Sequence, residues 1–202
     1  MEQSGTVILE YKTANSLGGA YWHGTVLGRE MKFARVLCGL AVPKLDREAA
    51  AVIAIGELLR GFAPPDFHGL SAATGSWPAV KGALSQFCRD LKPSDVVCED
   101  EQSRRLVWPI TDALVGQLPV NVLSSVAPAH ATSELGRQNV EQLIDHDQLH
   151  IGHLLDILDS EKDQANKALQ LAVNYALEYT AFYGGKKRGP LELKRVFGTE
   201  GL

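Results

Sequence analysis

An α/β fold is predicted by two features of the amino-acid sequence. Short segments rich in β-branched and aromatic residues alternate with longer segments in which apolar residues recur every three or four positions. The 202 residues, 45% of them hydrophobic, suffice for one well-buried domain and are too few to assume two. We therefore expect a mixed sheet of about five strands flanked by helices, with a helical extension at the C-terminus.

The N-terminal segments 6–11, 20–27 and 32–40 are predicted to be strands. The first is rich in β-branched residues, and the run 15–19 contains the asparagine and glycines that reverse the chain. A second turn at 28–30 separates the other two segments. Three strands joined by short turns predict an antiparallel meander.

Residues 45–60 are predicted to form a buried helix. The segment opens with Asp46 as an N-cap and then runs through alanine and aliphatic residues without proline. Gly61 and the following prolines end it. Glu48 lies in its first turn, where a carboxylate is either a solvated end group favoured by the helix dipole or a placed functional acid.

The middle of the chain is predicted to alternate strands with helices. Helices are expected at 77–91, with Pro78 in the first turn, and at 104–118, where Pro109 marks the true first turn, because apolar residues recur there at helical spacing. Strands are expected at 67–74 and 120–126. Residues 95–98 form either a brief strand or a buried extended segment.

Two further helices are predicted after the loop 127–133. Apolar residues between 140 and 158 fall on one stripe of a single long helix. The next helix spans about 162–184 and has a stripe of small residues over 165–176. That stripe packs either on its own domain or on a partner chain, so a homodimer or larger complex is one expectation.

Composition and charge exclude several classes of protein. A net charge of −4 gives no global basic field, so any contact with nucleic acid has to rest on a local patch. Cys38, Cys88 and Cys98 form no Cys-x-x-Cys pair, which argues against a disulfide framework or a zinc ribbon and favours a reducing, cytoplasmic compartment. No apolar stretch approaches the roughly 20 residues that span a bilayer, so we expect no membrane partner.

The order of the predicted elements resembles the ribonuclease H fold, and several segments carry the resemblance. Residues 47–49 look like the family's Ala-Glu helix start, and 73–84 look like its fourth strand running into a helix. The closing pattern of helix, strand, Gly-His-Ala loop and carboxylate-bearing helix is similar to 104–143. We therefore expect a ribonuclease H-like domain over residues 1–145, a helical extension continuous with it over 146–185, and a basic tail over 186–202.

The resemblance implies four carboxylates that hold two metal ions for phosphodiester hydrolysis, because hard divalent cations prefer oxygen ligands. These acids lie on the first strand, on the first helix, at the end of the fourth strand and on the last helix. In this sequence Lys12 or its neighbour Tyr11 falls at the first position and Gly75 at the third, whereas Glu48 is retained and Glu141 stands in on the last helix. The losses predict a pseudoenzyme, which is a non-catalytic module for nucleic-acid binding or assembly.

An active nuclease is the alternative prediction. It would hydrolyse an RNA/DNA hybrid with Mg²⁺ or Mn²⁺, and His130 would match the family's loop histidine near the scissile phosphate. A solvated loop histidine is the simpler explanation of that residue. The acids available to this alternative are Glu48, Glu141, Glu10, Glu99 and Asp100.

A second alternative is a metal-binding helix. His146, His150 and His153 are spaced by four and by three, which puts them on one face of the predicted long helix and suits Zn²⁺ or Ni²⁺. The segment resembles the last-helix motif of DinB-like metal-binding bundles. Further ligands could come from Asp147, His23 or His68, and the alternative explanation is an ordinary polar face.

The C-terminal tail is the basic patch of the chain. Glu192 is the single acid among its five cations, and such a patch gains affinity for phosphates by releasing counterions. RNA, DNA or an RNA/DNA hybrid is therefore the expected partner, unless the tail is a solvated end or docks a protein. The cations are Lys186, Lys187, Arg188, Lys194 and Arg195.

Overall fold

A computed structural model describes residues 7–13, 19–43, 49–60 and 64–179. Its strands are β1 (Leu9–Lys12), β2 (Tyr21–Val26), β3 (Arg29–Ala41), β4 (Ala50–Leu58), β5 (Phe67–Gly75), β6 (Asp95–Cys98), β7 (Leu123–Val126) and β8 (Leu149–His150). Its α-helices are α1 (Trp77–Leu91), α2 (Glu101–Asp112), α3 (Glu134–Asp145), α4 (Leu155–Leu158) and α5 (Lys162–Glu178). Two short 3₁₀ turns, Gly152–Leu154 and Asp159–Glu161, flank α4.

The sheet is organised around β3. Residues Phe33–Ala41 of β3 pair with β4 on one edge, whereas on the other edge β2 pairs with Arg29–Phe33 and β6 with Leu37–Leu40. Strands β3, β4 and β5 are antiparallel, and β6 and β7 continue the sheet in parallel to β3. The chain therefore runs β3-β4-β5-α1-β6-α2-β7 through an order β5-β4-β3-β6-β7, which confirms the predicted ribonuclease H-like mixed sheet.

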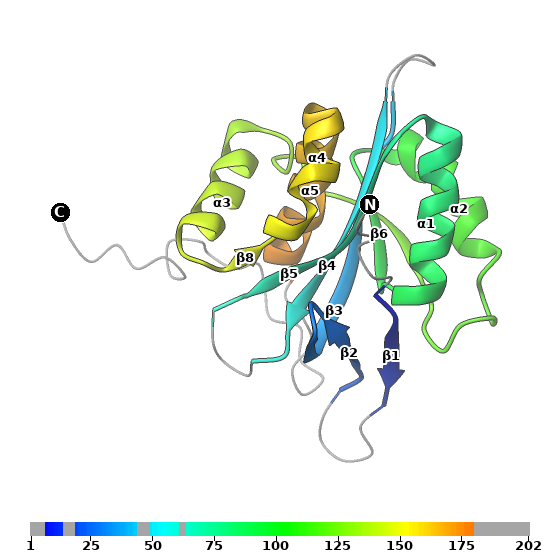
Figure 1. The fold of residues 1–202 in the computed structure, drawn as a ribbon. Coiled ribbons are helices and arrows are strands. Elements are labelled where there is room, and N and C mark those ends of the chain that lie inside the picture. Colours follow the sequence, from blue (N-terminus) through cyan, green and yellow to red (C-terminus); the bar gives the residue numbers. More distant parts are fainter. Residues whose placement is uncertain (1–6, 14–18, 44–48, 61–63, 180–202) are drawn as a thin grey trace.

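Helices cover both faces of this sheet (Figure 1), with α1 and α2 on one face and α3, α4 and α5 on the other. Alternate residues of β3 pack into the two hydrophobic cores, one on each face of the sheet. Val36, Cys38 and Leu40 pack on the side of α1, whereas Leu37 and Ala41 pack on the side of α5. Strands buried on both faces are apolar at every position, as expected beneath two helical layers. No helix among the described residues is both long and apolar enough to cross a membrane.

The predicted helix over 45–60 is wrong, because the described part of that segment is the central strand β4. Every residue from Ala50 to Gly56 is buried between the neighbouring strands and the two helical layers. An unbroken apolar run suits a doubly buried strand as well as a buried helix. The β-branched residues Val52, Ile53 and Ile55 fit the pleated surface of the sheet. Residues 45–48 lie outside the described residues.

The predicted long helix over 140–158 is also wrong, because it is broken into four pieces. Helix α3 ends at Asp145, Asp147 has a positive φ of 55°, and β8, a 3₁₀ turn and α4 follow. Helix α2 begins three residues earlier than predicted and carries Pro109 inside it. The other predicted strands are confirmed, as is the helix 77–91.

Helix α5 packs on its own sheet, which decides between the two expectations for its small-residue stripe. Ala165, Ala168 and Ala172 are at most 1% exposed and lie against β3 and β4. Small side chains allow this close approach, which agrees with the missing side chain at Gly39 beneath them. The stripe is therefore part of the domain core.

Candidate functional site

The fold shifts the family pattern along the chain. In the ribonuclease H fold, three antiparallel strands precede the first helix. In this structure the three strands directly before the first helix are β3, β4 and β5, so the family's first strand corresponds to β3 and not to the segment 6–11. Lys12 lies instead on the added strand β1, where its Nζ is 3.1 Å from Glu10 Oε2. Gly75 ends β5 with a φ of 136°. The first helix is α1, whose first turn carries no acidic residue.

The carboxyl ends of β3 and β6 lie side by side, with Leu40 paired to Cys98. The last six residues of β3 are apolar and buried. Glu99 follows β6, and Lys167 of α5 places its Nζ 2.6 Å from Glu99 Oε2. Asp100 caps α2 by accepting a hydrogen bond from the backbone N–H of Ser103 at 2.8 Å. Both acids at this end of the sheet therefore have protein partners.

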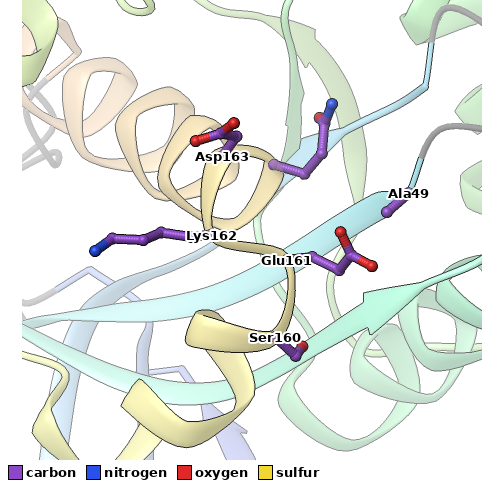
Figure 2. A pocket seen from close by; sticks show the side chains of 6 residues that line it. Ala49, Ser160, Glu161, Lys162 and Asp163 are labelled. Atoms are coloured by element: carbon purple, nitrogen blue, oxygen red, sulfur yellow. The ribbon is translucent and has the colours of Figure 1, made fainter.

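A pocket opens where the chain enters α5 (Figure 2). It is lined by Ala49 and by residues 160–164, and the Glu161 carboxylate lies on the side of Ala49. Lys162 extends away from that side. Glu48, which the resemblance placed on the family's first helix, precedes Ala49 and is outside the described residues, whereas the first helix of the structure is α1. The pocket combines acids with a lysine and is not a purely acidic cluster.

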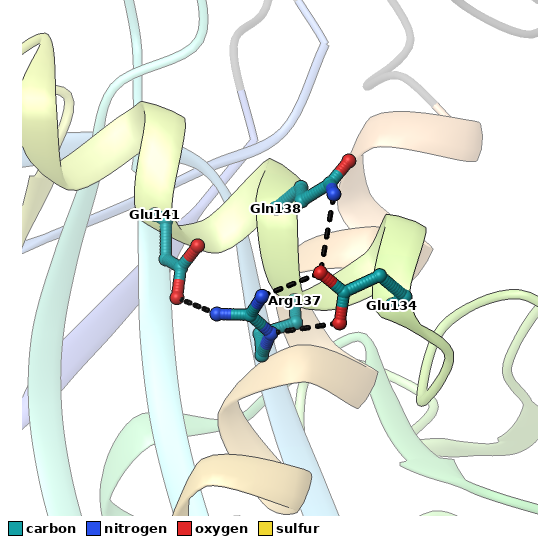
Figure 3. A network of polar contacts seen from close by, with 4 residues as sticks. All are labelled: Glu134, Arg137, Gln138 and Glu141. Carbon is teal, nitrogen blue, oxygen red and sulfur yellow. Dashed lines mark hydrogen bonds and ion pairs between the residues drawn. The ribbon is translucent and has the colours of Figure 1, made fainter.

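Glu141 lies on the exposed face of α3 in a network of charged side chains (Figure 3). Its carboxylate forms an ion pair with Arg137, which also holds Glu134. Gln138 donates a further hydrogen bond to Glu134. Pairing with Arg137 and Gln138 lowers the pKa of the Glu134 carboxyl. Glu141 is thus part of a surface ion-pair network along one helix, and its contact with Arg137 is an ordinary i, i+4 pair.

Three of the other predicted site residues are histidines in the segments that flank α3 and α4. His130 is half-buried in the turn before α3, where its carbonyl accepts hydrogen bonds from the backbone N–H and the hydroxyl of Ser133. His146 follows α3, with its Nδ1 at 2.7 Å from the carbonyl oxygen of Gln142. His153 lies in the 3₁₀ turn before α4. The basic tail is outside the described residues.

His150 enters a different cluster from the one its helical spacing predicted. Strand β8 pairs in parallel with β5, and this register sets His150 beside His68. The two rings stack with centroids 4.4 Å apart and planes at 28°. Asp66 precedes β5 two residues before His68, so both side chains fall on one face. The Asp66 Oδ1 atom lies 3.1 Å from His150 Nε2 and 3.7 Å from His68 Nε2.

Burial dominates the electrostatics of this cluster. Desolvation lowers the pKa of His68, and the neighbouring His150, Arg60 and His153 lower it further against the opposing effect of Asp66. Desolvation also lowers the pKa of His153. The buried atoms Asp66 Oδ1 and His68 Nδ1 make no hydrogen bond of good geometry among the described residues, so the contacts of Asp66 Oδ1 with the histidines are ion-pair contacts. A group of Asp66, His68 and His150 can surround one cation, since their ligand atoms lie within 4.8 Å of one another.

Sequence reasoning named His150 as a ligand and His68 as a distant candidate, but it missed Asp66. The available signal was the spacing of Asp66 and His68 at the start of a predicted strand, where alternate residues share a face. Nothing in the local sequence pairs that strand with residues 149–150. The partnership with His150 follows from the parallel pairing of β8, which is a tertiary contact.

No family model and no curated protein matches the chain. Among solved structures, the fowlpox virus Holliday junction resolvase has a TM-score of 0.47 at 10% identity, covering 70% of this chain and 96% of that one. The same resolvase in complex with Holliday junction DNA has a TM-score of 0.46 at 11% identity, covering 69% and 95%. Thermus thermophilus RuvC has a TM-score of 0.39 at 11% identity, covering 70% and 92%.

Proposed function

We propose that this chain is a ribonuclease H-like domain protein that associates with nucleic acid without cleaving it. The observation that carries the proposal is the chemistry at the carboxyl ends of β3 and β6. The β3 residues there are apolar and buried, and Glu99 is already neutralised by Lys167 at 2.6 Å. A pair of hard divalent cations needs several oxygen donors, so these residues do not fit the two-metal centre that the fold family implies.

The nucleic-acid part of the proposal rests on the basic tail. Five cations within residues 186–195 concentrate positive charge in a chain whose net charge is −4. Such a segment binds phosphates through counterion release and therefore gives salt-dependent affinity for RNA, DNA or an RNA/DNA hybrid. Binding through a tail requires no catalytic centre, which is consistent with the first part of the proposal.

Cleavage and binding should be measured together on the full chain. Labelled RNA/DNA hybrid, single-stranded and duplex substrates are incubated with excess protein and with Mg²⁺ or Mn²⁺. We expect no product. Cleavage that disappears in Glu48→Ala, Glu99→Gln or Glu141→Ala would overturn the non-catalytic proposal in favour of the active nuclease.

Binding is followed by fluorescence anisotropy at several salt concentrations. The variant Lys186→Ala/Lys187→Ala/Arg188→Ala should bind more weakly and show a shallower salt slope, by up to about 0.9 for each lost contact with a duplex phosphate. The charge-matched control Lys81→Ala/Arg89→Ala/Arg105→Ala removes three exposed cations of α1 and α2 and should bind like the wild type. Equal losses in both triple variants would contradict a role for the tail.

A further inference from the structure

We propose that Asp66, His68 and His150 bind a divalent first-row transition metal ion at the edge of the sheet formed by β5 and β8. The proposal concerns a place in the fold other than the ends of β3 and β6 and is independent of nucleic-acid binding. Two imidazoles and one carboxylate are borderline donors, which suit Zn²⁺, Co²⁺, Ni²⁺ or Cu²⁺ better than Mg²⁺ or Ca²⁺. Zn²⁺ is the natural probe because it tolerates such mixed sets.

The distances already approach those of a metal-bound set. Ligands about 2.1 Å from a tetrahedral ion stand roughly 3.4 Å from one another. Asp66 Oδ1 is 3.1 Å from the Nε2 of His150 and 3.7 Å from that of His68. These two distances bracket that value, and all three ligand atoms lie within 4.8 Å of one another, so side-chain rotations would bring them around one ion.

Backbone pairing holds all three residues in place. The N–H of Phe67 donates to the carbonyl oxygen of Gln148 at 2.8 Å, which fixes β8 against β5. On the other side, the N–H of Leu58 donates to the carbonyl oxygen of Asp66 at 2.8 Å. Sites on paired strands are more precise than sites on loops, so the cluster is organised before any ion binds.

The surrounding side chains orient the ligands from outside. Arg60 Nη1 lies 2.5 Å from Asp66 Oδ2, which occupies one carboxylate oxygen and turns the other toward the histidines. Asp147 Oδ1 lies 3.5 Å from His150 Nδ1 and thereby favours Nε2 as the ligand atom. Metal-binding histidines commonly use their second nitrogen in this way.

The burial of the Asp66 carboxylate gives further support. The side chain of Asp66 is 5% exposed, and its Oδ1 makes no hydrogen bond of good geometry among the described residues, although the Nε2 atoms of His150 and His68 lie 3.1 and 3.7 Å away. Buried polar atoms are normally paired, because an unpaired one costs about 1–3 kcal/mol. A cation beside Asp66 Oδ1 would satisfy that oxygen. Three protein donors leave a further coordination position for water or another ligand, reached from the side of His150, which is 32% exposed.

Zn²⁺ binding to the tag-free, chelator-treated full chain tests the site by competition with a chromophoric chelator. We expect one equivalent to bind. His68→Ala and His150→Ala should each weaken binding by more than the roughly 10–100-fold cost of losing an outer-shell partner. Asp147→Asn should fall within that range. The control His146→Ala removes a histidine outside the cluster and should bind like the wild type.

A second readout guards against loss of fold. Zn²⁺ should raise the Tm of the wild type and of His146→Ala but not that of the milder variant His150→Gln, whose circular dichroism confirms folding. Absence of Zn²⁺ binding by the folded wild type would overturn the proposal. So would unchanged affinity in His150→Gln, or a loss in His146→Ala equal to that in His150→Ala, which would favour the set His146, His150 and His153.

Discussion

Gly39 of β3 lies directly against Ala168 of α5. A Cβ atom added to Gly39 would stand 1.9 Å from the carbonyl oxygen of Ala168 and 2.9 Å from the Cβ atom of Ala172. The obstacle is largely helix backbone, which cannot rotate away as a long side chain could. Gly39 therefore sets how closely the last helix approaches the central strand.

The variant Gly39→Ala should lose at least about 3 kcal/mol of unfolding free energy, since overpacking against backbone is among the most costly core changes. Urea denaturation of the purified protein measures this loss. Gly82→Ala is the matched control, because Gly82 is exposed in α1 with nothing within 4 Å of an added Cβ atom. That control should gain about 0.5–1 kcal/mol from the helix propensity of alanine. Equal effects in the two variants would contradict the close approach.

Asn174, fully buried on α5, should be as sensitive as Gly39 for a different reason. Its Nδ2 donates to the carbonyl oxygens of Gly136 at 3.0 Å and Ala131 at 3.3 Å, and its Oδ1 accepts from Asn139 Nδ2 at 2.6 Å. Asn174→Leu keeps the volume but leaves these partners unpaired in the core, at a cost of about 3 kcal/mol.

A double-mutant cycle separates this network from simple packing. Asn139→Leu removes the partner amide, so the variant Asn139→Leu/Asn174→Leu should lose less stability than the sum of the single losses. Urea denaturation of the four proteins gives the coupling free energy. Additive losses would mean that the hydrogen bond between the two amides contributes nothing.

Much of the fold could be predicted from the sequence, but β4 could not. The segment from Ala50 to Leu58 is apolar at nearly every position, and periodicity separates helix from strand only where one face is polar. Burial under helices on both faces removes that contrast. The predicted ribonuclease H-like sheet is confirmed, but its first three strands are β3, β4 and β5 and not the segments 6–11, 20–27 and 32–40.

The candidate metal cluster shows a similar limit. The helical spacing that predicts His150 as a metal ligand is not present in the structure, because the helix ends before Asp147 and His150 lies in strand β8. Its actual neighbours, Asp66 and His68, are more than 80 residues away in sequence. A local pattern can suggest which residue types bind metals, whereas strand pairing decides which of them meet.

The cysteine thiols should be inert in the folded protein. Burial raises the pKa of Cys88 and of Cys98 to about 12, and it raises that of Cys38 as well. At pH 8 roughly one thiol in 10⁴ with such a pKa is ionised, and the thiolate is the reactive form. A chromogenic disulfide reagent at pH 8 should therefore react slowly with the native protein. In guanidinium chloride it should react with all three cysteines of each chain. Rapid labelling of the native protein would contradict the burial of these residues.

Mild acid should destabilise the metal-free protein, because burial lowers the pKa of His68 and of His153 below their ordinary value of 6.5. Above that pH both histidines are neutral in the folded and the unfolded chain. As the pH falls, the unfolded chain takes up protons first, so the unfolding free energy decreases until the folded-state pKa values are passed. Urea midpoints between pH 7.5 and 5.5 in the presence of EDTA should therefore fall with pH. The variant His68→Gln/His153→Gln should show a shallower decrease, and an unchanged decrease would assign the acid sensitivity to other groups.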